Sequence, residues 1–226
     1  MSERPALTPE ARDALDRVLR LLAEERASVS SITDLEEARR VHVADALTGL
    51  EVEALCEAEQ IADIGSGAGF PGIVLAAALP HARVDLIESV GRKCEFMRRA
   101  LDESGIANAE VVEGRSEEWA SGTGRESYDA VTARAVGRLS TLAELASPLL
   151  RAGGPLVAWK GRRDADEESQ LSSAADRLAM RPEQILSVGP YAGSRHRHLH
   201  VIRKDGPTPP DLPRRPGMAK KRPRGN

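Results

Sequence analysis

A glycine-rich loop between a short apolar run, residues 60–64, and a second apolar stretch that begins at Gly72 constrains this chain most. Three glycines in five residues, Gly65, Gly67 and Gly69, let the backbone turn sharply and approach a ligand closely. A helix after the loop would direct its free N–H groups into the same crevice. The loop therefore predicts a strand–turn–helix unit that binds a small molecule at the carboxyl end of a parallel sheet.

Short apolar runs and helical patterns alternate along the chain after residue 56. We expect strands at 60–64, 83–88, 110–113, 128–134, 155–160, 184–188 and 198–203, and helices at 72–79, 92–104, 139–150 and 166–180. This alternation is typical of an α/β protein with a doubly wound parallel sheet. No helical pattern separates the last two strands, so we expect them to form an antiparallel hairpin at one edge.

Helical patterns precede this α/β unit and a basic segment follows it. Thr8 before Pro9 predicts the start of a first helix, and Asp34 before Glu37 predicts the start of a second one that runs toward residue 50. We therefore divide the chain into an N-terminal helical extension (1–55), an α/β domain (56–205) and a basic, Pro-rich tail (206–226). The density of proline predicts no packed element in the tail.

Composition narrows the class of protein. With 41% hydrophobic and 30% charged residues, the chain suits a globular core. Its longest apolar run, residues 72–79, is far below the roughly 18 residues that span a bilayer, and the first residues lack the pattern of a signal peptide. Cys56 and Cys94 have no CxxC spacing, which predicts two reduced thiols and no metal site. We expect a cytoplasmic protein and, without a dedicated dimer helix, a monomer.

Charge is distributed unevenly. From Arg195 onward the chain holds ten Lys/Arg and two Asp, a net charge of +8, although the whole chain has a net charge of −3. An acidic body with a basic arm is typical of a protein that contacts a polyanion. The alternative is a solvated tail that only maintains solubility.

Two cofactors fit the glycine loop. The spacing from Gly67 to Gly72 matches the GxGxxG pattern of dinucleotide enzymes, and Glu88 ends the second strand, where an acid binds ribose hydroxyls. Asp63 discriminates between the two cofactors, because a carboxylate two residues before the first glycine would repel the diphosphate of NAD and attract the cationic S-adenosylmethionine. We therefore favour S-adenosylmethionine over NAD; a turn that serves only the fold is the remaining alternative.

With these features, the sequence resembles the family of bacterial 16S ribosomal RNA guanine-N7 methyltransferases, also known as glucose-inhibited division protein B. Seven separate stretches carry the resemblance: 40–45 (RVHVAD), 63–72 (DIGSGAGFPG), 91–96 (GRKCEF), 114–118 (GRSEE), 132–135 (TARA), 160–161 (KG) and 214–217 (RRPG). It implies a class I S-adenosylmethionine-dependent methyltransferase fold, a Rossmann-like sheet of seven strands whose last strand is antiparallel. It also implies methyl transfer to N7 of one guanine in 16S ribosomal RNA, free or in a small-subunit particle.

The resemblance further implies cofactor contacts at Gly65, Phe70, Ser116, Glu117 and Arg134. The sequence departs from the family before residue 40. Family members carry a Trp-rich helix that ends in Asn-Leu-Thr, whereas residues 25–33 here contain no aromatic residue. A role of the N-terminal helices in substrate binding therefore does not carry over.

The residues also indicate which acceptor suits the chain. Residues 133–136 read Ala-Arg-Ala-Val, not the Asn/Asp-Pro-Pro-aromatic loop typical of methylation at an exocyclic amine, and neither cysteine is placed to attack a pyrimidine. Guanine N7 has an exposed lone pair and no proton to lose, so no general base is needed. Arg134 and Lys160, which end neighbouring strands, are the candidate catalytic residues that position the acceptor. The alternative for Arg134 is an ion pair that only neutralises the pocket, with Asp63, Glu88 or Glu117.

Candidate RNA contacts are the histidine and the cations near the loop and in the tail: His42, Arg92, Arg115, Lys160, Arg214, Arg215, Lys220 and Lys221. His42 and Asp45 lie three residues apart, which could orient the imidazole toward a phosphate. His196, His198 and His200 alternate along one strand and predict a polar, RNA-facing edge instead of a metal site. Two other functions stay open, a methyltransferase for small molecules and a non-catalytic RNA-binding assembly factor.

Overall fold

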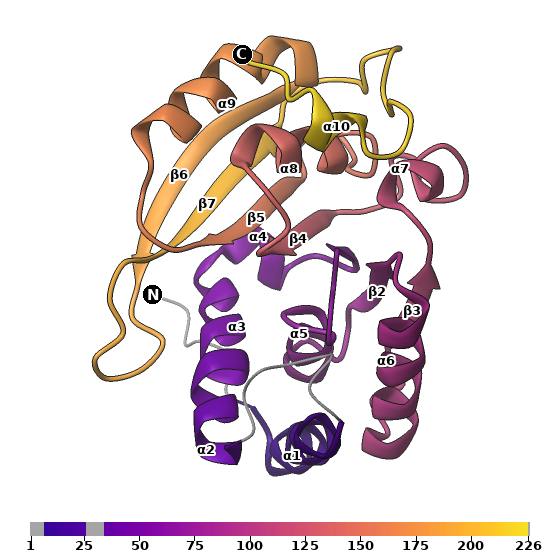
Figure 1. The fold of residues 1–226 in the computed structure, drawn as a ribbon, viewed down its shortest axis with the longest axis vertical. Coiled ribbons are helices and arrows are strands. Elements are labelled where there is room, and N and C mark those ends of the chain that lie inside the picture. The colour runs from indigo at the N-terminus through magenta and orange to yellow at the C-terminus, as the bar shows by residue number, and fades with distance from the viewer. Residues whose placement is uncertain (1–6, 26–33, 226) are drawn as a thin grey trace.

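Seven strands form one sheet in the computed structural model, which describes residues 7–25 and 34–225. The strands are β1 (Gln60–Ile64), β2 (Arg83–Glu88), β3 (Ala109–Glu113), β4 (Ala130–Arg134), β5 (Pro155–Lys160), β6 (Met180–Val188) and β7 (Arg197–Lys204). Their order is β3-β2-β1-β4-β5-β7-β6, and β7 runs antiparallel to both of its neighbours (Figure 1). The predicted α/β class with an antiparallel last strand is confirmed.

The expected strands are all present; β3 and β7 differ from the expected ranges by one residue at one or both ends, and β6 and β4 differ by more. β6 begins at Met180, four residues before the predicted start, and its pairing with β7 shifts register between Pro182 and Gln184. Proline cannot donate to a ladder and marks an edge strand or a bulge, so the sequence concealed the first half of β6. β4 begins at Ala130, and Tyr128 before it forms only an isolated bridge to Leu150.

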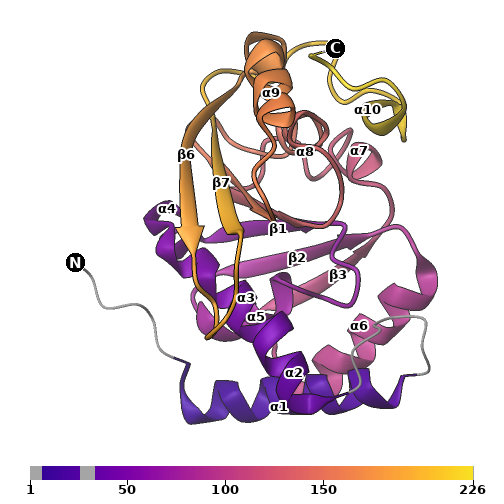
Figure 2. The ribbon, with the colours of Figure 1, turned by 60° about the vertical axis from the view of Figure 1, so that its left-hand side comes forward.

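Helices cover both faces of the sheet. They are α1 (Pro9–Glu24), α2 (Leu35–Ala38), α3 (Asp45–Leu47), α4 (Glu53–Cys56), α5 (Gly72–Ala78), α6 (Gly91–Ser104), α7 (Ser116–Trp119), α8 (Leu139–Ala146), α9 (Ala165–Leu178) and α10 (Met218–Lys221). α1, α5 and α6 lie on one face, and α8 and α9 lie on the other (Figure 2). None of the helices in the described part of the chain combines the length and the apolar character that crossing a bilayer requires.

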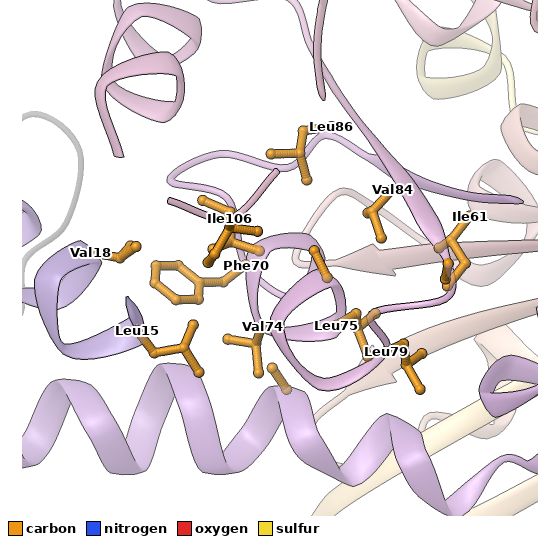
Figure 3. Packing of buried hydrophobic residues seen from close by; sticks show 14 of the residues in the cluster. Leu15, Val18, Ile61, Phe70, Val74, Leu75, Leu79, Val84, Leu86 and Ile106 are labelled. Atoms are coloured by element: carbon orange, nitrogen blue, oxygen red, sulfur yellow. The ribbon is translucent and has the colours of Figure 1, made fainter. Parts of the chain in front are cut away.

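The core divides between these two faces because successive side chains of a strand point in opposite directions. In β1, Ile61 belongs to the cluster shared with α1, α5 and α6, whereas Ile64 belongs to the cluster shared with α8 and α9. Figure 3 shows the first cluster, in which Phe70 of the glycine loop lies near Leu15 and Val18 of α1. Phe70 thus anchors the glycine loop to this cluster.

The second predicted helix begins as expected and then changes geometry. The side chain of Asp34 accepts the N–H of Glu37 at 2.7 Å, which confirms the predicted cap. After α2 the chain forms a π-helical turn, η1 (Arg39–Ala44), then α3 and a 3₁₀ turn, η2 (Thr48–Glu51). π-turns often occur at functional sites. The aromatic-free stretch discussed above lies, apart from Glu25, outside the described residues.

The tail contains a packed element, so the prediction that it would not is wrong. α10 forms within it, and Leu212 is 3% exposed. The partners that order the tail are acidic groups of the body far away in sequence, which composition does not reveal. The division at residues 55 and 205 stays a prediction.

One of these partners, Glu126, supports a stability prediction. Lys204 is fully buried, and its ammonium donates to Glu126 Oε1 at 2.9 Å, to the Leu150 carbonyl at 2.6 Å and to Thr208 Oγ1 at 2.7 Å. Glu126→Gln removes the charge that compensates this buried ammonium. We expect the free energy of unfolding at pH 7, measured with urea, to fall by about 2 kcal/mol, less than for a fully buried pair because Glu126 is partly exposed.

Lys204 and Thr208 lower the pKa of Glu126 to about 2. The contribution of Glu126 is therefore complete above its unfolded pKa, near 4.5, and is lost as the pH falls toward 2. Glu183→Gln, which breaks a more exposed pair with Arg203, is the control and should change stability by less than about 0.5 kcal/mol. Equal losses for the two variants would contradict the prediction.

Candidate active site

The glycine loop needs its glycines. Gly65, Gly67 and Gly69 have φ values of +65°, +63° and +91°, a region that other residues rarely adopt. A Cβ on Gly65 would also lie 2.7 Å from Val136 Cγ2, and one on Gly72 would lie 2.2 Å from Leu86 Cδ2. The loop therefore packs closely against β2 and against the chain that follows β4.

Asp63 lies behind this loop. Its side chain is fully buried, where Oδ1 accepts the hydroxyl of Thr132 at 2.8 Å and Oδ2 accepts the N–H of Gly72 at 3.1 Å. Burial raises the pKa of this carboxyl to about 6. The first N–H of α5 is thus engaged within the protein, and the expectation that the first amides of this helix are free for a ligand is wrong for Gly72.

Glu88 ends β2 beside the loop. Its Oε2 accepts the N–H of Gly67 at 3.0 Å, and its Oε1 accepts the N–H groups of Ser89 and Val90 at 2.8 and 3.0 Å. The same carboxylate lines a pocket. Glu88 therefore both holds the glycine loop and presents negative charge to whatever occupies that pocket.

We call this pocket the loop pocket. Its volume is about 170 Å³, and it is lined by Ile64, Gly65, Ile87, Glu88, Ser89, Gly114, Arg115, Ser116, Glu117, Val136, Thr141, Leu145, Gly217, Ala219 and Lys220. It thus unites four predicted cofactor residues, Gly65, Glu88, Ser116 and Glu117, from the ends of three strands. Asp63, Gly67, Phe70 and Arg134, also predicted cofactor residues, are not part of its lining.

Phe70 points into the core. Its side chain is 4% exposed, and its ring stacks on His42 with centroids 4.7 Å apart and planes at 19°. Burial and the nearby Arg134 lower the pKa of His42 to about 4, so its imidazole is neutral at pH 7. The stack joins the glycine loop to the π-turn η1.

Arg134 at the end of β4 contacts the same turn. Its guanidinium donates to the Val41 carbonyl at 3.3 Å and to Asp45 Oδ2 at 3.2 Å, and lies 3.3 Å from His42 Nδ1. The sequence offered Asp63, Glu88 and Glu117 as ion-pair partners, but the observed partner is Asp45. Arg134 therefore contacts both members of the His42–Asp45 pair that the sequence places three residues apart.

A second pocket, which we call the Arg134 pocket, has a volume of about 220 Å³ and is lined by Asp45, Arg134, Ala135, Trp159, Lys160, Gly161 and Arg197. Arg134 and Lys160 do end neighbouring strands, as expected. The ammonium of Lys160 donates to Glu167 Oε1 at 2.7 Å and to the Gly137 carbonyl at 3.1 Å. Arg197 was not among the predicted site residues; the one signal for it in the sequence is its place beside the last predicted strand.

The other predicted RNA contacts vary in exposure. Arg92, Arg115, Arg215, Lys220 and Lys221 are exposed, whereas the guanidinium of Arg214 is engaged with Glu144.

The prediction that the alternating histidines form a polar edge is wrong for His200, which is 4% exposed. β7 lies between β5 and β6, so it is not an edge strand, and His200 lies in its buried central part, whereas His198 is partly exposed. The described residues hold no group of three or more side chains suited to a metal ion.

Solved structures share this architecture. A predicted O-methyltransferase from Agrobacterium tumefaciens superposes with a TM-score of 0.55 at 25% identity, over 73% of this chain and 80% of that one. The fibrillarin pre-rRNA processing protein of Methanococcus jannaschii superposes with a TM-score of 0.56 at 16% identity, over 72% of this chain and 74% of that one. The predicted class I methyltransferase fold is confirmed.

Sequence comparison is more specific. The chain is 39% identical over 198 residues to the ribosomal RNA small subunit methyltransferase G of Pelotomaculum thermopropionicum, covering 87% of this chain and 82% of that protein. It is 34% identical over 220 residues to the protein of the same name from Moorella thermoacetica, covering 96% and 92%. The model of the GidB family, rRNA small subunit methyltransferase G, matches residues 14–199. The chain belongs to this family of ribosomal RNA methyltransferases.

Proposed function

We propose that the protein transfers the methyl group of S-adenosylmethionine to N7 of a guanine in 16S ribosomal RNA. One observation carries the proposal: residues 134–136 separate two pockets, since Arg134 and Ala135 line one and Val136 lines the other. The lining of the loop pocket includes the carboxylates of Glu88 and Glu117 beside Arg115 and Lys220, and three of the seven residues that line the Arg134 pocket are cations. A cationic donor and an anionic acceptor can therefore meet across this short segment.

The donor side is the loop pocket. Glu88 accepts the two ribose hydroxyls, the segment Ser116–Glu117 lies against the adenine, and the backbone of Gly65 follows the rest of the donor. Asp63, Gly67 and Phe70 act through the loop that they hold in place. Three carboxylates, Asp63, Glu88 and Glu117, favour a sulfonium over the diphosphate of NAD.

The acceptor side is the Arg134 pocket. Guanine N7 attacks without losing a proton, so this side needs to orient the base and exclude water. Arg134 and Arg197 offer donors to guanine O6 and to the adjoining phosphate. Lys160 holds the chain after Arg134 through Gly137 and adds positive charge. His42, neutral and stacked, supports Arg134.

Exposed cations provide phosphate contacts, which add affinity more than specificity. They are Arg92, Arg115, Arg215, Lys220 and Lys221. The partner is 16S ribosomal RNA or a small-subunit particle, and we place the enzyme in the cytoplasm, where that RNA is made. We further propose that it works as a monomer.

Labelled S-adenosylmethionine incubated with the protein and 16S ribosomal RNA tests the proposal. The expected product is RNA labelled at N7 of a guanine, and S-adenosylmethionine should bind in preference to NAD. Label on small metabolites would favour the small-molecule alternative. Donor binding without transfer to RNA or to small-subunit particles would favour the assembly factor, and tight binding of NAD alone would refute the donor assignment.

Asp63 predicts a pH dependence of donor binding. Because its pKa is about 6, the carboxyl is mostly ionised at pH 7 and mostly protonated at pH 5. Protonation removes a negative charge behind the cationic donor. We expect the dissociation constant of S-adenosylmethionine, measured by calorimetry, to rise about fivefold from pH 7 to pH 5, the effect of about 1 kcal/mol of Coulomb attraction.

Asp63→Asn is the matched variant, since its amide is neutral throughout and its dissociation constant should be flat over this range. The donor's own α-amino group titrates near pH 8 and His42 near pH 4, so neither changes much in the window. A wild-type constant that is equally flat would contradict the prediction.

A further inference from the structure

The C-terminal segment forms part of the wall of the loop pocket. Gly217, Ala219 and Lys220 line the pocket together with Glu117 of α7 and Thr141 of α8. Figure 1 shows this segment in yellow beside α7 and α8. The charge of the tail predicts an arm for RNA, yet three of its residues line the pocket that we assign to the donor.

Two hydrogen bonds attach the wall to the pocket. The N–H of Gly217 donates to Glu117 Oε1 at 2.8 Å, and the hydroxyl of Thr141 donates to the Ala219 carbonyl at 3.3 Å. Gly217 has a φ of +80°, so the turn before α10 suits glycine. The tail thus fixes the carboxylate of Glu117, a residue predicted to contact the cofactor.

Arg214 anchors this wall to the body. Its guanidinium forms a two-pronged contact with Glu144 of α8, Nε to Oε1 and Nη2 to Oε2, both at 2.6 Å. Nη2 also donates to the carbonyl of Arg222 at 2.8 Å, which joins the two ends of the segment 214–222. The side chain of Glu144 is only 2% exposed. A planar guanidinium matches a carboxylate in this geometry, whereas a lysine makes a point contact.

We propose that Arg214 and Glu144 are a positioning pair that holds residues 214–222 as a wall of the donor pocket, so that Arg214 serves donor affinity and not phosphate binding. The inference rests on the proposed donor site but not on transfer to RNA. The neighbouring residue, Arg215, is exposed. Adjacent arginines therefore have separate roles, Arg214 toward the donor and Arg215 toward RNA.

Arg214→Gln and Arg215→Gln are a matched pair, each removing one positive charge. Binding is measured with S-adenosylhomocysteine by calorimetry and with 16S ribosomal RNA over a series of salt concentrations. For Arg214→Gln we expect the S-adenosylhomocysteine dissociation constant to rise about tenfold, because the charged contact with the buried Glu144 is lost. We expect the affinity for RNA to stay within about twofold. For Arg215→Gln we expect unchanged S-adenosylhomocysteine binding and a salt slope reduced by about 0.7 to 0.9, one phosphate contact.

The reverse pattern overturns the inference: Arg214→Gln with a reduced salt slope and unaltered S-adenosylhomocysteine binding. Arg214→Lys keeps the positive charge but not the two parallel hydrogen bonds to Glu144, and should recover part of the donor affinity. Its KM for the donor should be raised and its kcat should stay near that of the wild type. A melting temperature measured on each variant separates lost affinity from unfolding.

Hydrogen exchange on the wild-type chain gives a readout that needs no variant. S-adenosylhomocysteine should slow exchange of the amides at 217–220, and unchanged exchange there would overturn the inference. A wild-type protein that binds S-adenosylhomocysteine but fails to methylate RNA would refute the proposed function and leave this inference standing.

Discussion

Glu88→Ala is expected to raise the dissociation constant of S-adenosylmethionine by about 100-fold. Glu88 lines the loop pocket at the end of β2, and it is the carboxylate that we assign to the two ribose hydroxyls. Hydrogen bonds to a charged group contribute about 1.5–3 kcal/mol each. Two such bonds at the lower end of this range contribute about 3 kcal/mol, which corresponds to about two orders of magnitude in affinity. Calorimetric titration of the purified variant at pH 7 measures it.

A matched control separates this effect from a general loss of negative charge. Glu113→Gln alters the carboxylate at the end of the next strand, β3, which is exposed and pairs with Arg98 on the surface. It should leave the dissociation constant within about twofold. Because Glu88 also holds the N–H of Gly67, Glu88→Gln is the second variant, since its amide oxygen still accepts that hydrogen bond. If Glu88→Gln and Glu88→Ala both bind as the wild type does, the ribose assignment is wrong.

The sequence predicted the features that depend on neighbouring residues. The turn at Gly65 and the acids Asp63 and Glu88 stand within or directly after apolar runs, and the carboxyl ends of parallel strands meet at one edge. Position at a strand end was therefore predictable. Which way each side chain points was not, because that depends on packing: Asp63 turns behind the loop, whereas Glu88 lines the pocket.

Contacts between segments that are far apart in the chain could not be predicted from the sequence. Arg134 and Asp45 are 89 residues apart, and Arg214 and Glu144 are 70 apart, so no local pattern links them. The net charge of the tail predicted contact with a polyanion, but charge alone does not show which cations a buried carboxylate already holds. The π-turn η1 was hidden as well, since residues 39–44 have ordinary helical character in sequence.

Arg134→Gln is expected to lower the rate of methyl transfer to RNA by about 100-fold or more, with the donor dissociation constant within about threefold. Arg134 lines the Arg134 pocket, which we assign to the acceptor, and its guanidinium donates to the Val41 carbonyl and to Asp45. Its loss would release the π-turn from β4 and leave the charge of Asp45 facing the base. A misplacement of about 1 Å in a reacting pair costs about 100-fold. Single-turnover transfer at saturating RNA and donor measures the chemical step without product release.

Arg138→Gln is the matched control, an exposed arginine four residues later, before α8, which should transfer at a rate near that of the wild type. Arg134→Lys retains a positive charge opposite Asp45 but not the planar donors, so an intermediate rate is expected. Arg134→Gln leaves the buried carboxylate of Asp45 without its ion-pair partner, which can destabilise the protein. The melting temperature of each variant shows whether a lower rate reflects unfolding. Arg134 lines one pocket, and Val136, two residues later, lines the other, so the step that the substitution slows or weakens identifies the role of Arg134. A loss confined to donor affinity would assign Arg134 to the donor, whereas a loss confined to the transfer step assigns it to the orientation of guanine N7.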